Sequence, residues 1–505
     1  MPADPYPGPV LDLLAAAGDR PVFEHGDRAV TGAQLLALVR RCAAGLRAAG
    51  LGPGDGLALR LGVTPEAFAA IMASYVVGAR VVGVRPGLPA DQLHHLLSQD
   101  ITAVVTDASP PPPTPALSTS ALSTPALSTP LPVTLPLGEL LEIPDDGSLV
   151  LSGRPDDVAR LVHTSGSTGR PKACAQTYAS MNAAWNARPS AWPPAISELA
   201  SRLQRYLVFG TLSSQVMMEY GILTLAAGGT MVAADPPSLP DAIAQHRATG
   251  SVITVPRLYK LVAAQRTTPS DLSTLRALMV SGSPIPASRL REAQEVLGPV
   301  VFHGYGQTET GMISMATPYD PPPSVGIPPD AVDIEIRDVS GEDGELYVRT
   351  PSQAIGYWGD PEETAEVFVD GWIRTRDLGH FDTDGRLHLA GRTRDVVIVN
   401  AELHYIGPIE RTLATSPDVA EAYVTAAPDE DTGEAPHAFV VPAPGRTPDL
   451  GALRDLVKDR LGAACVPATI TLIDEVPTAP SGKPDKRLLK PPRVGQLRRC
   501  SMEAR

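Results

Sequence analysis

Short aliphatic runs alternate with helix-like stretches through the first two thirds of the chain, and this alternation limits the possible folds. Residues 251–255 read Ser-Val-Ile-Thr-Val just before Pro256, and residues 277–280 read Ala-Leu-Met-Val ahead of Pro286. Proline is favoured in the first turn of a helix, where its missing N–H would be unpaired anyway. Each pair therefore predicts a buried strand followed by a helix. Repeated in this way, the pattern predicts an α/β fold with doubly wound layers.

The pattern changes twice toward the C-terminus. From Gly344 onward the segments GELYVRT and GRLHLAG lie on either side of Asp384-Gly385, a turn signal, so we expect a β-rich subdomain. A compact α+β pattern begins after Gly391 and ends near Leu489. We therefore predict a large N-terminal domain over residues 1–391, a small mobile domain over 392–490 and a basic tail over 491–505. The hinge between the two domains is predicted at Arg394 and Asp395.

A low-complexity segment interrupts the large domain. Residues 109–136 contain the run PPPPTP and three near-copies of a pentapeptide, ALSTS, ALSTP and ALSTP. Such a composition buries too little apolar surface to fold by itself. We expect an exposed loop there.

Charge and cysteine usage exclude several classes of protein. The 505 residues include 42 Lys and Arg against 56 Asp and Glu, a formal net charge of −14, which argues against a nucleic-acid-binding surface. The four cysteines are scattered without a CxxC pair, so neither a zinc site nor a disulfide framework is indicated. The N-terminus has no basic start with an apolar core after it, and Arg80 interrupts the longest apolar run. We expect a soluble cytoplasmic protein without a membrane partner.

A loop rich in glycine and hydroxyl groups follows a predicted core strand. Val158, Leu161 and Val162 form the apolar run, and Thr164-Ser165-Gly166-Ser167-Thr168-Gly169 comes next, ahead of Lys172. Glycines turn backbone N–H groups inward, hydroxyls add donors, and the lysine adds a mobile charge, a combination that suits a polyphosphate. The spacing is not that of a Walker loop. The alternative, a Gly/Ser surface turn, does not explain the strand before it.

Three further motifs carry groups that suit a nucleotide. In FHGYGQTETG, Tyr305 can stack on a base, Thr308 can bond a phosphate and Glu309 can hold Mg²⁺. In residues 372–395, Asp377 can accept both ribose hydroxyls and Arg392 can bridge ribose and phosphate. Each motif also has an ordinary structural interpretation when taken alone. Tyr305 could be a packed aromatic residue, Glu309 could be a carboxylate in the first turn of a helix, and residues 372–395 could form a plain hairpin. The last motif, PTAPSGKPDKRLL, places Lys483 on a turn, where a lone lysine is usually solvated.

Taken in this order, the four motifs resemble the adenylate-forming (ANL) superfamily, which contains acyl- and aryl-CoA synthetases, adenylation domains of peptide synthetases and luciferase-like enzymes. The resemblance covers the chain from about Arg20 to Leu489. It implies that a large domain and a small C-terminal lid enclose ATP, Mg²⁺ and a small-molecule acid. The carboxylate attacks the α-phosphate to give an acyl-adenylate and pyrophosphate, and the acyl group then passes to the thiol of coenzyme A or an acyl carrier protein.

The resemblance also implies a role for each motif residue. The β- and γ-phosphates would contact Thr164, Ser165, Gly166, Ser167, Thr168, Gly169 and Lys172. The adenine side of the site would be formed by Ser281, Gly282, Ser283, Pro284, His303, Gly304 and Gly306, with Tyr305 stacked on the base. Asp377 and Arg392 would hold the ribose, and the catalytic residues would be Thr308 on the α-phosphate, Glu309 on Mg²⁺, and Lys483 between carboxylate and α-phosphate. Phe209, Ser213 and Met217 would form part of the acid pocket.

The chain departs from the family pattern after Arg392. Where the family usually has a lysine, a glycine, an isoleucine, a proline and a first glutamate, this chain has Ile398, Ala401, His404, Ile406 and Pro408, and only Glu410 keeps the pattern. Ala401 adds a methyl group where a thiol arm would pass the backbone. In addition, Arg376 replaces a glycine that is common before Asp377.

These departures leave alternatives open for the function. One is an adenylating enzyme without coenzyme A ligation: an acyl-AMP ligase, or an enzyme that activates a small oxyacid such as nitrite for an amine. Another is a degenerate nucleotide-binding protein. The joint retention of Lys172, Glu309, Asp377, Arg392 and Lys483 argues against the latter, because a pure binder has no need of Lys483. Cys174 lies close to Lys172, but no base is evident near it, and we interpret it as a buried packing residue.

Overall fold

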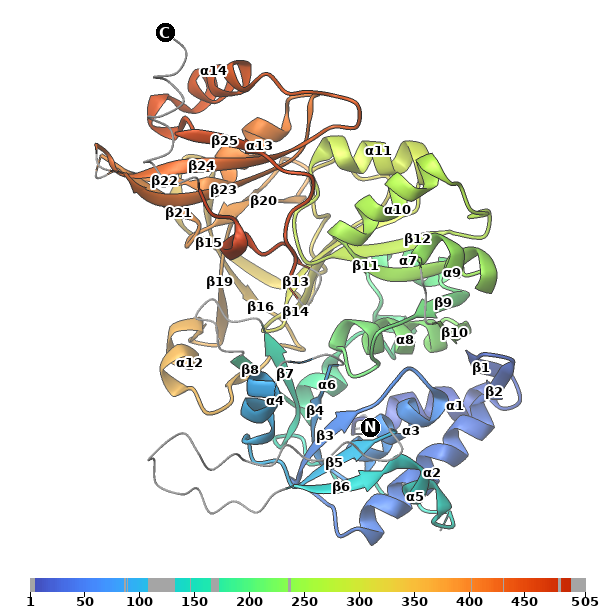
Figure 1. Cartoon of the computed structure of the whole chain (residues 1–505). Coiled ribbons are helices and arrows are strands. Elements are labelled where there is room, and N and C mark those ends of the chain that lie inside the picture. The colour runs from blue at the N-terminus through green and yellow to red at the C-terminus, as the bar shows by residue number, and fades with distance from the viewer. Residues whose placement is uncertain are drawn as a thin grey trace.

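Two large sheets form the centre of the molecule (Figure 1). The computed structural model describes residues 5–85, 88, 90–107, 132–145, 147–164, 172–234, 238–400, 402–429, 431–479 and 483–491. The first sheet has the spatial order β14 (Gly311–Ala316), β13 (Val301–Gln307), β12 (Ala277–Ser281), β11 (Gly250–Thr254), β9 (Arg205–Val208), β10 (Thr230–Ala233), β1 (Pro21–His25) and β2 (Arg28–Thr31). Its pairs are parallel except at the two edges, where β14 and β2 run antiparallel to their neighbours.

The second sheet contains the two strands on either side of the predicted phosphate loop, β7 (Val158–Thr164) and β8 (Lys172–Thr177), next to its edge strand β17 (Gly356–Tyr357). Its order is β17, β8, β7, β4 (Arg80–Gly83), β3 (Gly56–Arg60), β5 (Ala103–Thr106) and β6 (Val133–Pro136). Strand β6 occupies the end of the segment expected to be a loop, because residues 133–136 pair in parallel with β5. Residues 108–131 lie outside the described ranges.

Helices fill the space between the two sheets and cover their outer faces. A single core joins the sheets and contains Phe23, Leu57, Phe68 and Ile222, all buried. The helices that contribute to it include α1 (Gly8–Ala17), α2 (Gly32–Ala48), α3 (Pro65–Val76), α5 (Leu137–Glu142), α6 (Tyr178–Ala183), α7 (Pro194–Arg202) and α8 (Gln215–Ala226). The other face of the first sheet is covered by α9 (Leu239–His246), α10 (Val255–Thr267) and α11 (Ala287–Leu297), and α4 (Ala90–Leu97) packs on the second sheet.

The proline signals were interpreted correctly. Strand β11 passes directly into α10, which has Pro256 in its first turn, and Pro286 is the N-cap of α11 after β12. Strands β11, β12 and β13 are neighbours in sequence and in the sheet, and all run parallel. Their carboxyl ends therefore lie together at one edge, which is where open α/β sheets bind ligands.

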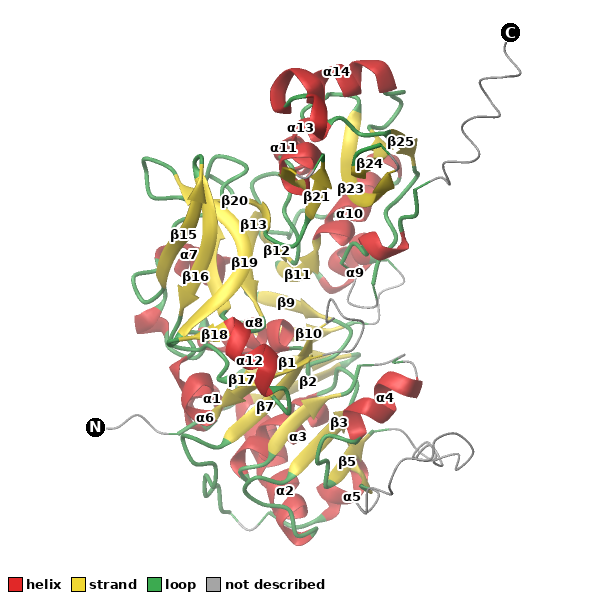
Figure 2. Ribbon diagram, turned by 90° about the vertical axis from the view of Figure 1, so that its left-hand side faces the viewer, coloured by secondary structure: helices red, strands yellow, loops and turns green. Residues whose placement is uncertain are grey.

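Two smaller sheets follow along the chain (Figure 2). The third sheet consists of β15 (Asp333–Ser340), β16 (Asp343–Arg349), β19 (Trp372–Phe381), β18 (Phe368–Val369) and β20 (Leu387–Arg392), with α12 (Pro361–Val367) beside it. The fourth sheet consists of β22 (Glu402–Tyr405), β21 (Val396–Val399), β24 (Gly433–Pro442), β23 (Val419–Asp429) and β25 (Thr469–Leu472), and it packs against α13 (Ile406–Ala414) and α14 (Leu450–Leu461). We call residues 396–491 the C-terminal unit.

The C-terminal unit has a hydrophobic core of its own. Val397, Ile409, Leu413, Val440 and Val457 are fully buried in a cluster made only of residues from this unit. Strand β20 ends at Arg392 and β21 begins at Val396, so the chain passes from the third sheet to the fourth within three residues. The predicted α/β fold with a β-rich part and a smaller C-terminal part is confirmed. None of the helices in the described ranges has the length and apolar character needed to span a lipid bilayer.

The separate core makes the predicted domain division testable with Ile409→Ala. The substitution leaves a cavity in the C-terminal unit and should destabilise it by about 2–5 kcal/mol. Amide hydrogen exchange should therefore accelerate in residues 396–472 and stay unchanged in the two large sheets. Leu258→Ala, which leaves a cavity at a fully buried position on α10, is the matched control. It should accelerate amide exchange in the first large sheet and leave exchange in residues 396–472 unchanged. Equal acceleration in both parts would contradict an independent C-terminal unit.

Candidate active site

The carboxyl ends of β12 and β13 carry two of the predicted motifs side by side. Ser281 ends β12, and Gly282 follows it with φ +99°, a conformation that favours glycine. Residues 303–306 lie within β13, and the turn after it contains Thr308 and Glu309. Gly306 lies so close to β14 that an added Cβ would be 2.3 Å from the carbonyl oxygen of Gly311. The predicted adenine-side residues therefore lie at the ligand edge of the first sheet.

The carboxylate of Asp377 on β19 is held by three donors. The Tyr305 hydroxyl donates to Oδ2 at 2.8 Å, Gln307 Nε2 donates to the same oxygen at 2.7 Å, and Arg392 Nε donates to Oδ1 at 2.9 Å. Asp377 is buried, whereas the Arg392 side chain is 63% exposed. Burial and the neighbouring Asp377 raise the pKa of Tyr305 well above its usual value, so its hydroxyl stays a donor. The structure thus brings together Tyr305, Asp377 and Arg392, three of the predicted nucleotide-binding residues.

Glu309 lies beside this network and is oriented by a tyrosine. Its Oε1 accepts a hydrogen bond from the Tyr357 hydroxyl at 2.7 Å, and its backbone oxygen accepts one from Ala354 N–H at 2.8 Å. Burial, followed by the charge of Glu309, raises the pKa of the Cys174 thiol well above its usual value. A buried, protonated thiol agrees with the interpretation of Cys174 as a packing residue.

The residues present fit a magnesium ion that is bound mainly through phosphates. The described part of the chain contains no group of three or more His, Cys, Asp and Glu side chains placed to hold a metal. Mg²⁺ is commonly held by one or two carboxylates together with water and substrate phosphates, so a single carboxylate at Glu309 is sufficient.

Lys483 reaches this edge of the sheet from the end of the C-terminal unit. A Cβ built on Gly282 would lie only 3.0 Å from Lys483 Cε, so the glycine makes room for the lysine. The pKa of Lys483 is lowered, mainly because the neighbouring groups displace water from it and secondly by the positive charge of Arg392. The carboxylates of Glu309 and Asp377 oppose this and raise the pKa. The side chain nevertheless keeps access to solvent. Gly282, Arg392 and Lys483, which are far apart in the sequence, therefore lie close together at the edge of the first sheet.

Ion pairs fix the segment that carries Lys483. Lys486 Nζ lies 2.8 Å from Glu410 Oε1 and 3.4 Å from Asp395 Oδ2. Burial would raise the pKa of Glu410 and lower that of Lys486, and their mutual attraction opposes both effects. Elsewhere on the C-terminal unit, Glu421 Oε1 accepts from Arg289 Nη2 on α11 at 3.1 Å. The pair between Arg289 and Glu421 joins the C-terminal unit to the first large sheet, whereas the pairs of Lys486 hold the segment that carries Lys483 within the unit and to its connection.

Only part of the phosphate loop lies in the described ranges. Ser165, Gly166, Ser167, Thr168 and Gly169 fall outside them, and Thr164 is described only as the end of β7. Lys172 begins β8, and its Nζ lies 2.5 Å from Glu363 Oε1 and 5.3 Å from the centre of the Tyr357 ring. Since the hydroxyl of the same tyrosine donates to Glu309, Lys172 and Glu309 lie on the same side of the site.

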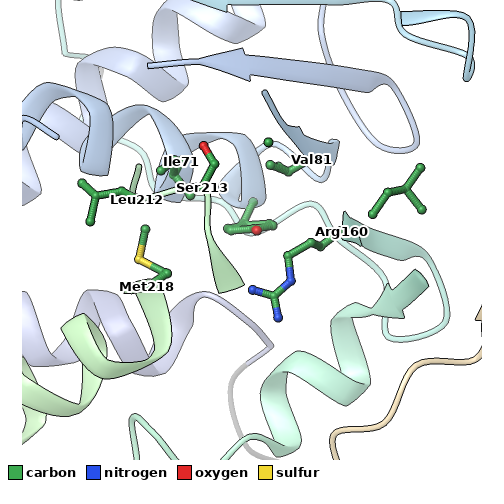
Figure 3. A pocket seen from close by; sticks show the side chains of 9 residues that line it. Ile71, Val81, Arg160, Leu212, Ser213 and Met218 are labelled. Atoms are coloured by element: carbon green, nitrogen blue, oxygen red, sulfur yellow. The ribbon is translucent and has the colours of Figure 1, made fainter. Parts of the chain in front are cut away.

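A small cavity lies between the two large sheets, at the N-terminal end of α8 (Figure 3). About 10 Å³ of it is open to the centre of a water molecule, which is room for one water. Its lining residues include Ile71, Val81, Arg160, Leu212, Ser213 and Met218. The Ser213 hydroxyl oxygen is buried without a hydrogen-bond partner among the described residues.

The three predicted acid-pocket residues have different surroundings. Ser213 lines the cavity, but Phe209 packs under the guanidinium of Arg257 at 4.5 Å, and Met217 Sδ accepts from the Tyr206 hydroxyl at 3.2 Å. Arg160 also lines the cavity, and it donates to Gln176 Oε1 through both Nε and Nη2. Met218 lies in the segment that was expected to form part of the acid pocket, whereas Arg160 was not identified from the sequence because it lies on another element, β7.

The chain matches two family models that together span most of its length. The model described as AMP-binding enzyme matches residues 13–358, and the AMP-binding enzyme C-terminal domain matches residues 408–483. The chain belongs to the AMP-binding enzyme family. The resemblance to adenylate-forming enzymes is thereby confirmed, and the protein is an AMP-forming acid ligase. Enzymes of this family bind ATP with Mg²⁺.

Several AMP-binding enzymes are similar over nearly the full chain. A feruloyl-CoA synthase of Amycolatopsis sp is 35% identical over 474 residues, which cover 91% of this chain and 93% of the relative. The fatty acid–[acyl-carrier-protein] ligase ScoC of Streptomyces coeruleorubidus is 31% identical, covering 92% and 91%. The solved structure of the amide bond synthetase McbA from Marinactinospora thermotolerans superposes with a TM-score of 0.82 at 34% identity, covering 95% of this chain and 98% of that one.

Four residues that contact the site of this AMP-binding enzyme were not predicted. Gln307 and Glu410 stand inside recognised patterns but were given no role, whereas Tyr357 and Glu363 were identified by no local pattern. Each of them acts by pairing with a residue far away in the sequence. Such pairs become visible only when the sheets are assembled.

His303 is one of the predicted adenine-side residues, and its burial makes the stability of the protein depend on pH. The side chain is 5% exposed, and its Nε2–H donates to the Ser283 carbonyl at 3.4 Å. Burial lowers the pKa of His303 from 6.5 to about 4. The folded protein therefore keeps this imidazole neutral at pH 5, while an unfolded chain protonates it.

His303→Asn should reduce the loss of stability in mild acid. The folded pKa of His303 lies below the unfolded one, so this residue does not reduce the unfolding free energy above pH 6.5. As the pH falls toward 4, the unfolded chain binds a proton that the folded protein does not, and the unfolding free energy decreases, by about 2 kcal/mol at pH 5. Urea unfolding at pH 7 and pH 5 should show a smaller difference in unfolding free energy for the variant than for the wild type. His94→Asn, at an exposed position on α4, is the control and should keep the wild-type difference. An unchanged difference in the His303 variant would contradict the assignment.

Proposed function

We propose that this AMP-forming ligase activates an aryl-substituted carboxylic acid with MgATP and passes the acyl group to a thiol. The observation that carries the proposal is the position of Lys483, which lies against Gly282 and close enough to Glu309, Asp377 and Arg392 for their charges to affect its pKa. A lysine from the C-terminal unit in this place is suited to the adenylation step. The aryl character of the acid is supported by the 35% identity to a feruloyl-CoA synthase.

The arrangement of charges suggests a role for each group. Asp377 would accept the ribose hydroxyls, with Tyr305 and Gln307 fixing its carboxylate, and the exposed guanidinium of Arg392 would reach the α-phosphate. Thr308, in the turn after β13, would donate to the same phosphate, and Glu309 would bind Mg²⁺. His303, Ser283 and Gly304 would lie on the adenine side.

Lys483 would stabilise the charge that develops when the carboxylate attacks. The acid is already an adequate nucleophile, so the reaction needs alignment and a cation at the pentacoordinate phosphorus. A preorganised cation placed where charge develops typically contributes two to three orders of magnitude to the rate. Its two neighbours of opposite sign, Glu309 and Asp377, keep the ammonium group between the two reactants.

The cavity lined by Ser213, Met218 and Arg160 is the best candidate for the far end of the acid pocket. It lies between the two large sheets, and the strand that carries Arg160 continues to Thr164 at the start of the phosphate loop. Four residues of extended strand span roughly 13 Å, about the length of an aryl-substituted propenoic acid. In the present arrangement the cavity has room for only one water, so an acid would enter by displacing side chains such as Met218.

An amine is the second candidate for the acceptor. The amide bond synthetase McbA is 34% identical to this chain, and the segment after Arg392 departs from the pattern of thiol-using relatives. Ile398, which replaces the usual lysine, lies on β21 opposite Leu403, and both side chains are about half exposed. Ala401 lies outside the described residues. Coenzyme A or a carrier protein remains the leading choice because the two curated relatives use these thiols.

Replacing Lys483 with alanine tests the adenylation proposal directly. Acid-dependent exchange of pyrophosphate into ATP should fall by about 10²–10³-fold, because the variant loses its transition-state cation, while the dissociation constant for MgATP changes little. The acids to be compared are cinnamic and benzoic acids, fatty acids, amino acids and nitrite.

Lys458→Ala removes an exposed lysine of α14 and serves as the control, with exchange at the wild-type rate expected. If the wild-type protein binds ATP but exchanges pyrophosphate with none of these acids, the degenerate binder becomes the better interpretation. Exchange that survives in the Lys483 variant would instead remove this lysine from the mechanism.

Product analysis with competing acceptors tests the choice of a thiol. With the active acid and MgATP, equal concentrations of coenzyme A and a primary amine should give more thioester than amide, as measured by mass spectrometry. Formation of AMP should require both the acid and the acceptor. Amide as the main product would favour the second candidate and leave the adenylation step intact.

A further inference from the structure

Helix α12 presents two carboxylates, one turn apart, to three cations from other parts of the chain. Glu363 Oε1 contacts Lys172 Nζ at 2.5 Å and Arg376 Nη1 at 2.8 Å. Glu366 Oε1 contacts Arg376 Nη2 at 2.8 Å and Arg394 Nη2 at 3.4 Å. The lysine that follows the phosphate loop therefore shares its carboxylate partner with Arg376.

This cluster is shielded from water at its centre. The side chains of Lys172, Glu363 and Arg376 are 13%, 16% and 14% exposed. Burial by itself would raise the pKa of Glu363, but hydrogen bonds from Lys172 and Arg376 outweigh it, and the pKa lies below its usual value. Glu363 is therefore an ionised carboxylate in a confined place, and such a group is costly to leave without a cation.

Arg376 adopts a backbone conformation that favours glycine. Its φ is +61°, in the left-handed region, where a side chain is strained. The backbone is held there by Thr393, whose N–H donates to the Arg376 carbonyl at 2.8 Å. A glycine would occupy the same place without strain, so the guanidinium between Glu363 and Glu366 is what the arginine adds. Strained residues of this kind gather at functional sites.

We propose that Arg376 is a positioning residue for ATP binding, which holds Glu363 while Lys172 turns from that carboxylate to the nucleotide phosphates. The inference rests on the proposed phosphate-binding role of Lys172. Without Arg376, Glu363 would keep Lys172 as its nearest cation and would repel the incoming phosphates. With Arg376, the carboxylate keeps a hydrogen-bonded cation throughout, and the other guanidinium nitrogen lies within ion-pair distance of Glu366.

The dissociation constant for MgATP, measured by equilibrium dialysis, tests this without knowledge of the acid. Arg376→Met keeps the aliphatic bulk but loses the charge, and it should weaken MgATP binding by about tenfold. Arg376→Lys keeps the charge without the fork and should restore part of the loss. In a Glu363→Gln background, where there is no carboxylate to hold, Arg376→Met should change the constant by less than about twofold.

Arg376→Gly and Arg247→Gly form a matched pair of controls. Arg247 also has a positive φ, +48°, but lies exposed at the C-terminal end of α9. Both substitutions relieve backbone strain, so neither should lower the thermal midpoint through the backbone, and only Arg376→Gly should weaken MgATP binding.

The possible outcomes separate this inference from the proposed function. If Lys172→Gln leaves MgATP binding unchanged, the phosphate role of Lys172 fails, and the inference fails with it. If Lys172→Gln weakens binding but Arg376→Met does not, the inference is overturned while the proposed function stands. An equal effect of Arg376→Met with and without Glu363 would also overturn it, because Arg376 would then act on the phosphates directly.

Discussion

The buried carboxylate of Asp377 is the point at which the parts of this enzyme are joined. Its donors come from β13 of the first sheet and from the last residue of β20, where the chain leaves for the C-terminal unit. This side chain thereby links the third sheet to the first and to the start of the connection, beside the hydrophobic cluster that Tyr305 and Ile313 form with Leu346 and Leu387. The same carboxylate is proposed to receive the ribose.

Polar contacts attach the C-terminal unit to the rest of the molecule, whereas its own interior is aliphatic. Its own core is formed by fully buried aliphatic side chains such as Ile409 and Leu413. Its contacts with the large sheets include the ion pair between Arg289 and Glu421, and the pair between Lys486 and Asp395 ties its last segment to the connection. The side chains of Arg289 and Glu421 are largely buried, whereas the pair between Lys486 and Asp395 keeps some solvent and contributes little net stability. The aliphatic core contributes much more. A separate core of this kind is what the predicted mobile domain requires.

The fold could be predicted from the sequence because its signals are local. A short aliphatic run followed by proline predicts a strand and a helix whatever the surroundings, and β11 with α10 and β12 with α11 follow this rule. The end of the low-complexity segment was missed because four residues carry no periodicity, and β6 forms only through pairing with β5. Tyr305, Asp377 and Arg392 were found through their motifs. Tyr357 and Glu363 were not, since each works through a partner dozens of residues away.

The electrostatics of the site are complete only with an anion present. The chain as a whole carries a formal charge of −14, yet Arg85 and Arg392 both lie close enough to Lys483 to lower its pKa. Positive charges that lie close together repel one another, which costs free energy in the folded protein. A bound polyanion would offset this repulsion. If a nucleotide binds here as proposed, its phosphates would attract Lys483 and raise its pKa. The lysine would then be most firmly protonated with both substrates present, which is the state in which the proposed mechanism needs its charge.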